Sequence, residues 1–171
     1  PADVDADPLV IERGPRTIVI AGSDAGARAE SLAHEGGWPL VAEIVSGARF
    51  GRQLVHGYRQ ALSAEHLGGR VERVVVFGHP TLSRESVALL SRADVEVIAV
   101  RGPGEPLNLN GSTVPADAVV VASGETDRAW LGEWMRASRD AAVDLSPPAP
   151  DAAGLASAEP RARLGAIAAE L

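Results

Sequence analysis

Short apolar runs rich in β-branched residues recur along the chain and constrain its fold more than any other feature. Four of the five runs are almost continuously hydrophobic, as strands that are covered on both faces of a parallel sheet require. The runs cover residues 17–21, 39–43, 73–77, 95–100 and 118–122. They predict five strands of a sheet that is buried on both sides.

Helical patterns separate these runs. Apolar residues spaced three and four positions apart indicate amphipathic helices, and capping residues mark where helices begin. The expected helices start near Ala25, near Leu54, at Ser83, and at Thr126 or Asp127. The alternation predicts an α/β fold, a Rossmann-like open parallel sheet of five or six strands with helices on both faces.

The segments around this pattern are rich in proline and small or polar residues. Residues 1–15 are interpreted as a linker from a preceding domain, and residues 16–142 as the Rossmann-like domain. Residues 143–158 are interpreted as a Pro/Ala-rich linker, and residues 159–171 as the first helix of a following domain. Residues 101–116 contain three prolines and three glycines and predict a long surface loop with room for one short strand. Because the chain does not begin with Met, we expect a piece of a longer protein.

Composition excludes several kinds of chemistry. Cysteine is absent, which excludes disulfides, thiolate catalysis and cysteine-based zinc sites. All 16 basic residues are arginine, so a Schiff-base lysine and a P-loop lysine are excluded as well. The net charge of −7 disfavours partners such as nucleic acid or an anionic membrane. No signal peptide or membrane-spanning run is recognisable, so we expect a cytoplasmic protein.

A glycine-containing turn follows the first strand, where Rossmann folds bind phosphate. The turn is Gly22-Ser23-Asp24-Ala25-Gly26, and Glu43 ends the second strand, where a ribose-binding carboxylate is expected. One hypothesis is therefore a stand-alone nucleotide- or metabolite-binding module. Against it, the spacing is G-x-x-x-G, and Asp24 would face the phosphate with a like charge. The alternative is that the two glycines only form a tight turn.

Arginines after the second and third strands are the other candidates. Arg84 follows Ser83 at the expected start of a helix, at the carboxyl edge where such sheets bind ligands, and an arginine there can bind a carboxylate. Arg49 and Arg52 lie on the loop after the second strand, at the same edge. The alternative for all three is an ordinary surface arginine. The four histidines lack metal-ligand spacing, and the sequence predicts neither catalytic residues nor metal ligands.

Two tryptophans share one face of the last expected helix. Trp130 and Trp134 are four residues apart, and Ala137 and Ala141 continue that face. The simplest interpretation is that this face packs in the core. A third functional hypothesis is an interaction domain in which this helix binds a partner.

The order of several motifs resembles the middle domain of thiamine-diphosphate enzymes. The motifs are IVIAGSDAG, GWPLVAEIVSGARFG, VVVFGHPTLSR, VEVIAV and WLGEW, across residues 16–142. Within that superfamily they are similar to the 2-succinyl-5-enolpyruvyl-6-hydroxy-3-cyclohexene-1-carboxylate synthases of menaquinone biosynthesis, from an actinobacterium-like genome. GWPLVAE, SGAR and PTLSR carry the narrower resemblance.

The resemblance implies a transferase of three domains. Such an enzyme decarboxylates 2-oxoglutarate on thiamine diphosphate with Mg²⁺ and adds the succinyl-semialdehyde unit to isochorismate. The cofactor lies between the N-terminal and C-terminal catalytic domains of two subunits, in a homodimer or homotetramer. The middle domain is mainly a scaffold. By itself this fragment is then expected to be inactive and to bind no cofactor.

The resemblance also implies a role for one arginine. Arg84 matches a basic position that helps to hold the substrate carboxylates. Relatives can carry two successive basic residues there, whereas Glu85 follows Arg84 in this chain. With Arg84, Arg49 and Arg52 would complete a cationic patch, and we hypothesise that a downstream acidic naphthoate binds there as a regulator.

Overall fold

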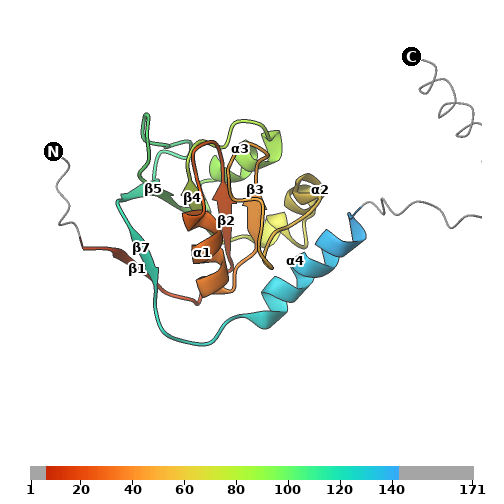
Figure 1. Ribbon diagram of the computed structural model, residues 1–171. Helices are drawn as coiled ribbons and strands as arrows, with labels where there is room; N and C mark the ends of the chain where they lie inside the picture. Colours follow the sequence, from red (N-terminus) through yellow and green to blue (C-terminus); the bar gives the residue numbers. More distant parts are fainter. Residues whose placement is uncertain (1–6, 143–171) are drawn as a thin grey trace, which may run out of the picture.

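A five-stranded parallel sheet forms the centre of the fold. The computed structural model describes residues 7–142 (Figure 1). The sheet has the order β3-β2-β4-β5-β6, and every neighbouring pair is parallel. Its strands are β2 (Thr17–Ala21), β3 (Leu40–Ala42), β4 (Arg73–Phe77), β5 (Glu96–Val100) and β6 (Val114–Ala116). The α/β, Rossmann-like prediction is confirmed.

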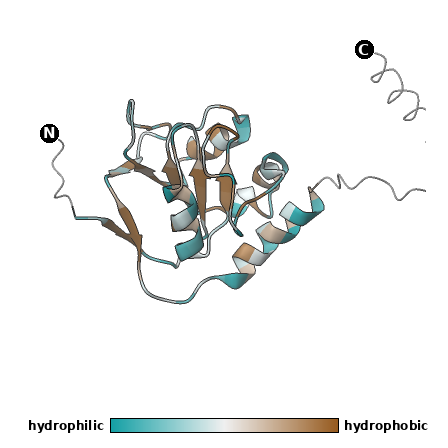
Figure 2. Cartoon of the chain, in the orientation of Figure 1, coloured by the Kyte–Doolittle hydropathy of each residue, from teal (hydrophilic) through white to brown (hydrophobic). Residues whose placement is uncertain are grey.

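The two faces of the sheet have different covers. On one face, alternate strand residues such as Ile18 and Val74 pack with α2 (Tyr58–Ser63), α3 (Arg84–Leu90) and α4 (Arg128–Asp140). Leu67 and Val71, which flank the 3-10 turn η1 (Gly68–Arg70), belong to the same core. On the other face, Val19 and Val75 pack with α1 (Arg28–Gly36). Figure 2 shows hydrophobic strands between helices whose outer sides are hydrophilic. Helices therefore lie on both faces, because the two-residue repeat of a strand sends apolar side chains to both sides.

The last predicted strand does not belong to the main sheet. Residues 118–122 give β7 (Val119–Val121), which pairs in parallel with β1 (Leu9–Ile11) as a separate two-stranded sheet. The fifth strand of the main sheet is β6 instead, inside the predicted loop 101–116. Pro115 is tolerated because β6 is an edge strand. The expectation that residues 118–122 extend the main sheet is wrong, because another apolar strand is available to pair with them.

The pairing of β1 changes the interpretation of residues 1–15. Ile11 is buried, and Arg13 donates hydrogen bonds to the carbonyls of Ala122, Glu35 and Gly36. Residues 9–13 are thus part of the folded unit, although they were expected in a linker. The predicted linker 143–158 and the predicted helix 159–171 lie outside the described residues, and the domain boundaries stay predictions.

Two of the helices begin at the capping residues that the sequence indicates. Ser83 Oγ accepts a hydrogen bond from the Ser86 amide, and an Asp127 carboxylate oxygen accepts one from the Trp130 amide. The helices expected near Ala25 and Leu54 begin later, at Arg28 and Tyr58. Gly26 and Gly57 have left-handed φ angles of 67° and 62°, which delay each helix until the chain has turned.

The tryptophans of α4 lie in the core. Trp130 and Trp134 are 2% and 0% exposed, and their rings meet edge-on with centroids 5.5 Å apart. Ser138 completes the buried face, and the predicted Ala137 is half-buried against the same core. Both tryptophans are therefore core residues and are not exposed to a partner. The hypothesis that this helix binds a partner stays a prediction. No helix in the described part of the chain has the length and apolar character to cross a membrane.

These two tryptophans provide a matched test of buried hydrogen bonding. Trp130 Nε1 donates to the Thr17 carbonyl over 2.9 Å, whereas Trp134 Nε1 is buried and has no hydrogen-bond partner in the described part of the chain. Both Trp→Phe changes remove a similar volume, but only Trp130→Phe removes a hydrogen bond. We expect Trp130→Phe to lower the free energy of unfolding by about 1 kcal/mol more than Trp134→Phe. Urea unfolding measures the difference, and equal losses would contradict the assigned pairing.

Candidate functional site

The order of the main sheet predicts where an open α/β fold would bind a ligand. Numbered within that sheet, the strands run 2-1-3-4-5, so successive strands are added in one direction from β2 and in the other direction from β4 onward. Ligands of such folds bind in the crevice outside the carboxyl ends of the strands at this reversal. The two loops that border it here are the Gly22–Gly26 turn after β2 and the Gly78–Pro80 turn after β4.

These two loops are in direct contact and close the crevice. Ser23 and His79 pair as an antiparallel bridge, with their amides and carbonyls exchanging hydrogen bonds of 3.0 and 2.9 Å. A Cβ atom built at Gly22 would collide with the backbone of His79 and Pro80, and one built at Gly78 would collide with the Ser23 carbonyl. The glycines therefore allow backbone to contact backbone, and the space that a phosphate would need is filled.

The amides of the glycine-containing turn are already used. Gly22 donates to Phe77, Ser23 to His79, Ala25 to Gly22 and Gly26 to Ser46, so four of the amides that could bind a phosphate have partners. Asp24 adds a negative charge at a left-handed φ of 63°. The turn fits neither a nucleotide pyrophosphate nor the diphosphate of thiamine diphosphate. Between residues 7 and 142, no three His, Asp or Glu side chains gather as metal ligands.

Glu43 has a structural role that replaces the expected contact with ribose. Its side chain is fully buried, and its carboxylate accepts hydrogen bonds from the amides of Leu82 (2.9 Å) and Thr81 (3.1 Å). A buried charge needs such partners to offset its lost hydration. Glu43 therefore fixes the loop that leads into α3, and the prediction of a ribose ligand is wrong.

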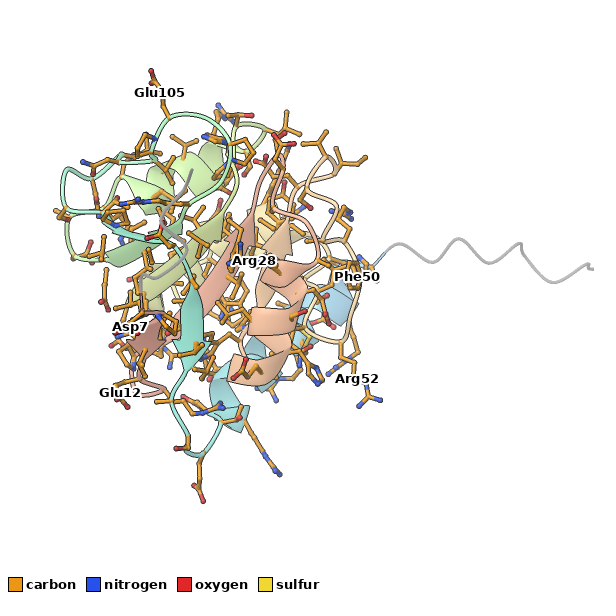
Figure 3. All side chains as sticks on the ribbon, turned by 60° about the vertical axis from the view of Figure 1, so that its left-hand side comes forward. Asp7, Glu12, Arg28, Phe50, Arg52 and Glu105 are labelled. Carbon is orange, nitrogen blue, oxygen red and sulfur yellow. The ribbon has the colours of Figure 1, made fainter. Side chains whose placement is uncertain are left out.

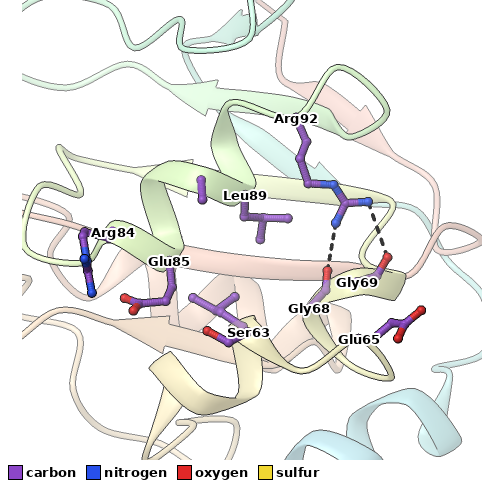
Figure 4. A pocket seen from close by; sticks show the side chains of 10 residues that line it. Ser63, Glu65, Gly68, Gly69, Arg84, Glu85, Leu89 and Arg92 are labelled. Atoms are coloured by element: carbon purple, nitrogen blue, oxygen red, sulfur yellow. Dashed lines mark hydrogen bonds between the residues drawn. The ribbon is translucent and has the colours of Figure 1, made fainter.

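Arg84 is the first residue of α3 and is exposed. It lines an open cavity of about 580 Å³ between α3 and the α2–η1 segment, shown in Figure 4. Arg92 lies in the same cavity, but its guanidinium donates to the carbonyls of Gly68 and Gly69 and pairs with Asp94. Among the described residues, no hydrogen bond or ion pair engages the Arg84 side chain. Its guanidinium is thus available to a carboxylate.

Glu85 takes the place of the second basic residue. Hydrogen bonds from its own amide and from Ser83 Oγ, followed by the charges of Arg59 and Arg84, hold the pKa of Glu85 below its ordinary value. Glu85 is therefore ionised at neutral pH beside Arg84. One cationic residue, not two, is presented at this position.

The structure does not bring Arg49 and Arg52 into the cavity that Arg84 lines. Arg49 Nη1 donates to the Ala42 carbonyl at the end of β3, over 2.8 Å. Arg52 projects outward on the same side of the molecule as Phe50 (Figure 3). A regulator site that includes Arg49 and Arg52 stays a prediction. Arg59, which the sequence did not indicate as a candidate, donates to the carbonyl of Leu82, two residues before Arg84.

The chain is similar to part of several curated proteins named 2-succinyl-5-enolpyruvyl-6-hydroxy-3-cyclohexene-1-carboxylate synthase. It is 48% identical to the protein of Leifsonia xyli subsp. xyli, across 92% of this chain and 29% of that protein. The identity is 44% for Nocardioides sp. and 43% for Kineococcus radiotolerans, across 83% and 80% of this chain and 28% of each relative. The chain thus spans less than a third of the length of these relatives. No family model matches it.

Proposed function

We propose that the chain, which belongs to the family of 2-succinyl-5-enolpyruvyl-6-hydroxy-3-cyclohexene-1-carboxylate synthases, is the noncatalytic middle domain of such an enzyme. The identity of 48% to a synthase of more than three times this length carries the proposal. The parent polypeptide, meaning the complete gene product that contains these 171 residues, would decarboxylate 2-oxoglutarate and transfer the succinyl-semialdehyde unit to isochorismate in menaquinone biosynthesis.

The cofactors of this reaction are assigned to the rest of the parent polypeptide. When bound, thiamine diphosphate would supply the electron sink that decarboxylation of a 2-oxo acid requires. In support, the Gly22–Gly26 turn, which resembles a phosphate loop in sequence, is closed by the Ser23–His79 bridge. The parent would be a cytoplasmic homodimer or homotetramer whose flanking domains bind thiamine diphosphate and Mg²⁺.

Arg84 is the residue of this chain for which we propose contact with substrate. Glu43 fixes the backbone just before α3, and Ser83 caps the helix. The Arg84 side chain then projects from the surface, with no hydrogen-bond or ion-pair partner among residues 7–142. Both proposed substrates carry carboxylates, which a guanidinium can bind through two parallel hydrogen bonds. In this role Arg84 binds and orients the substrate and takes no part in bond cleavage.

Arg84→Ala in the parent polypeptide tests this role. Loss of a hydrogen bond to a charged group costs about 1.5–3 kcal/mol, so we expect KM for one carboxylate substrate to rise about 10- to 100-fold. The effect on kcat should be smaller, because the contact is made before and during the reaction alike. Arg136→Ala, which removes an exposed arginine of α4, is the control and should leave KM unchanged. Equal KM values for both variants would refute the assignment.

A further inference from the structure

Four large apolar side chains are exposed beyond the carboxyl ends of the strands. Ile44 is 79% exposed, Val45 55%, Phe50 46% and Leu82 48%. Ile44, Val45 and Phe50 lie on the loop after β3, and Leu82 lies on the loop before α3. We call these four residues the apolar loop surface. Single exposed apolar residues are common, but a group of them marks a site of interaction.

The loop after β3 has an inverted polarity. Its polar residues Glu43 and Ser46 are 0% and 1% exposed, whereas the apolar residues between them, Ile44 and Val45, face solvent. A loop shaped only by the folding of this domain would bury the apolar pair and hydrate the polar one. The inversion therefore indicates a contact that the isolated domain does not satisfy.

The exposed conformation is fixed by hydrogen bonds. The Ser46 amide donates to the Glu43 carbonyl, Ser46 Oγ accepts from the Ala48 amide, and the Ser46 carbonyl accepts from the Gly26 amide. The loop is thus tied to the start of α1, and its apolar side chains are held outward. A preorganised surface of this kind loses little conformational entropy when it binds.

The buried carboxylate of Glu43 brings the two loops together. Glu43 directly precedes Ile44, and its carboxylate binds the amide of Leu82. Two exposed arginines lie beside them, since Arg49 donates to the Ala42 carbonyl and Arg59 to the Leu82 carbonyl. Each of these bonds uses one of the five N–H groups of a guanidinium. The apolar loop surface is therefore bordered by cations, although the chain as a whole carries a net charge of −7.

We propose that the apolar loop surface is where the remainder of the parent polypeptide docks onto this domain. The occupant would be a surface of that polypeptide with an apolar centre and carboxylates at its rim, which complement Arg49 and Arg59. The relatives that the chain matches are more than three times as long as the aligned region, so a large part of the polypeptide is available to cover the surface. This identification of the occupant rests on the proposed function.

Hydrogen exchange in the isolated 171-residue chain and in the parent polypeptide tests the proposal. Neither the Ile44 nor the Val45 amide donates a hydrogen bond within the described residues, so both should exchange rapidly in the isolated chain. In the parent we expect peptides that span 44–50 and 80–83 to exchange at least about tenfold more slowly. Equal rates in the two proteins would overturn the proposal. Slow exchange in the isolated chain that depends on its concentration would also overturn it, because a second copy would then be the occupant.

Substitutions separate docking from folding. Ile44→Asp with Val45→Asp should return the 80–83 peptide of the parent to its rate in the isolated chain. Leu109→Asp changes a residue that is 43% exposed on another loop. In this variant the 80–83 peptide of the parent should still exchange slowly. Thermal unfolding of the isolated chain with the same substitutions verifies that the domain still folds. Slow hydrogen exchange of the 80–83 peptide in the double variant of the parent would contradict the assigned surface.

The synthase assay distinguishes the two proposals. A parent polypeptide that protects the apolar loop surface but does not form the synthase product would refute the proposed function and leave the docking surface standing. A parent that forms the product while the surface exchanges freely would refute the docking surface alone.

Discussion

Replacement of Gly22 by alanine is expected to destabilise the domain by about 3 kcal/mol or more. The new Cβ would collide with backbone atoms of His79 and Pro80, which cannot move aside as a flexible side chain could. The loops after β2 and β4 would have to separate, and the Ser23–His79 bridge would break. Domains of this size have about 5–15 kcal/mol of stability in total, so the loss is a large fraction. Urea unfolding followed by tryptophan fluorescence measures it.

Gly14→Ala is the matched control for this experiment. A Cβ at Gly14 meets nothing within 4 Å, and neither glycine has a positive φ that a side chain would strain. We expect Gly14→Ala to change the free energy of unfolding by at most about 0.5 kcal/mol. Similar free energies of unfolding for both variants would mean that the crevice between β2 and β4 is open, and a nucleotide site would have to be reconsidered.

Replacement of Glu43 by glutamine is expected to lower the free energy of unfolding by about 1.5–3 kcal/mol. The carboxylate accepts two amide hydrogen bonds while fully buried, whereas the NH₂ group of glutamine would face one of those amides as a second donor. Chemical denaturation gives the change in stability. Hydrogen exchange should show that residues 80–83 become less protected, because these two bonds hold that loop.

Glu105→Gln controls for the loss of a carboxylate. Glu105 is exposed at the tip of the loop between β5 and β6, where Figure 3 shows its side chain pointing into solvent. We expect a change of no more than about 0.5 kcal/mol for this variant. If Glu43→Gln changed the free energy of unfolding as little as Glu105→Gln does, the Glu43 carboxylate would not be what fixes the loop that leads to Arg84.

Much of the main sheet can be predicted from the sequence, because strands buried on both faces are continuous in hydrophobicity. Residues 17–21 and 73–77 form β2 and β4 within the predicted bounds. The pairing partner of a short edge strand is harder to predict. Val119–Val121 and Val114–Ala116 are both short and apolar, yet the first pairs with Leu9–Ile11 and the second with β5 of the main sheet.

The site could be predicted only in part. The position of Arg84 at the start of α3 follows from the Ser83 cap, and the structure confirms that position. The role of Glu43 could not be predicted, because a carboxylate at a strand end is equally compatible with a ribose and with backbone amides. The run Glu43-Ile44-Val45-Ser46 could have indicated the apolar loop surface, because apolar residues continue past the end of the strand. Which of these residues face inward depends on the hydrogen bonds of Ser46.

A synthase assay tests the central claim most directly. The 171-residue chain and the parent polypeptide are each incubated with 2-oxoglutarate, isochorismate, thiamine diphosphate and Mg²⁺, and the succinylated product is measured. We predict that the parent forms the product and that the 171-residue chain forms none. Product formation by the 171-residue chain alone would place the catalytic residues within this domain and contradict its assignment as a scaffold. A folded parent that forms no product would contradict the proposed activity.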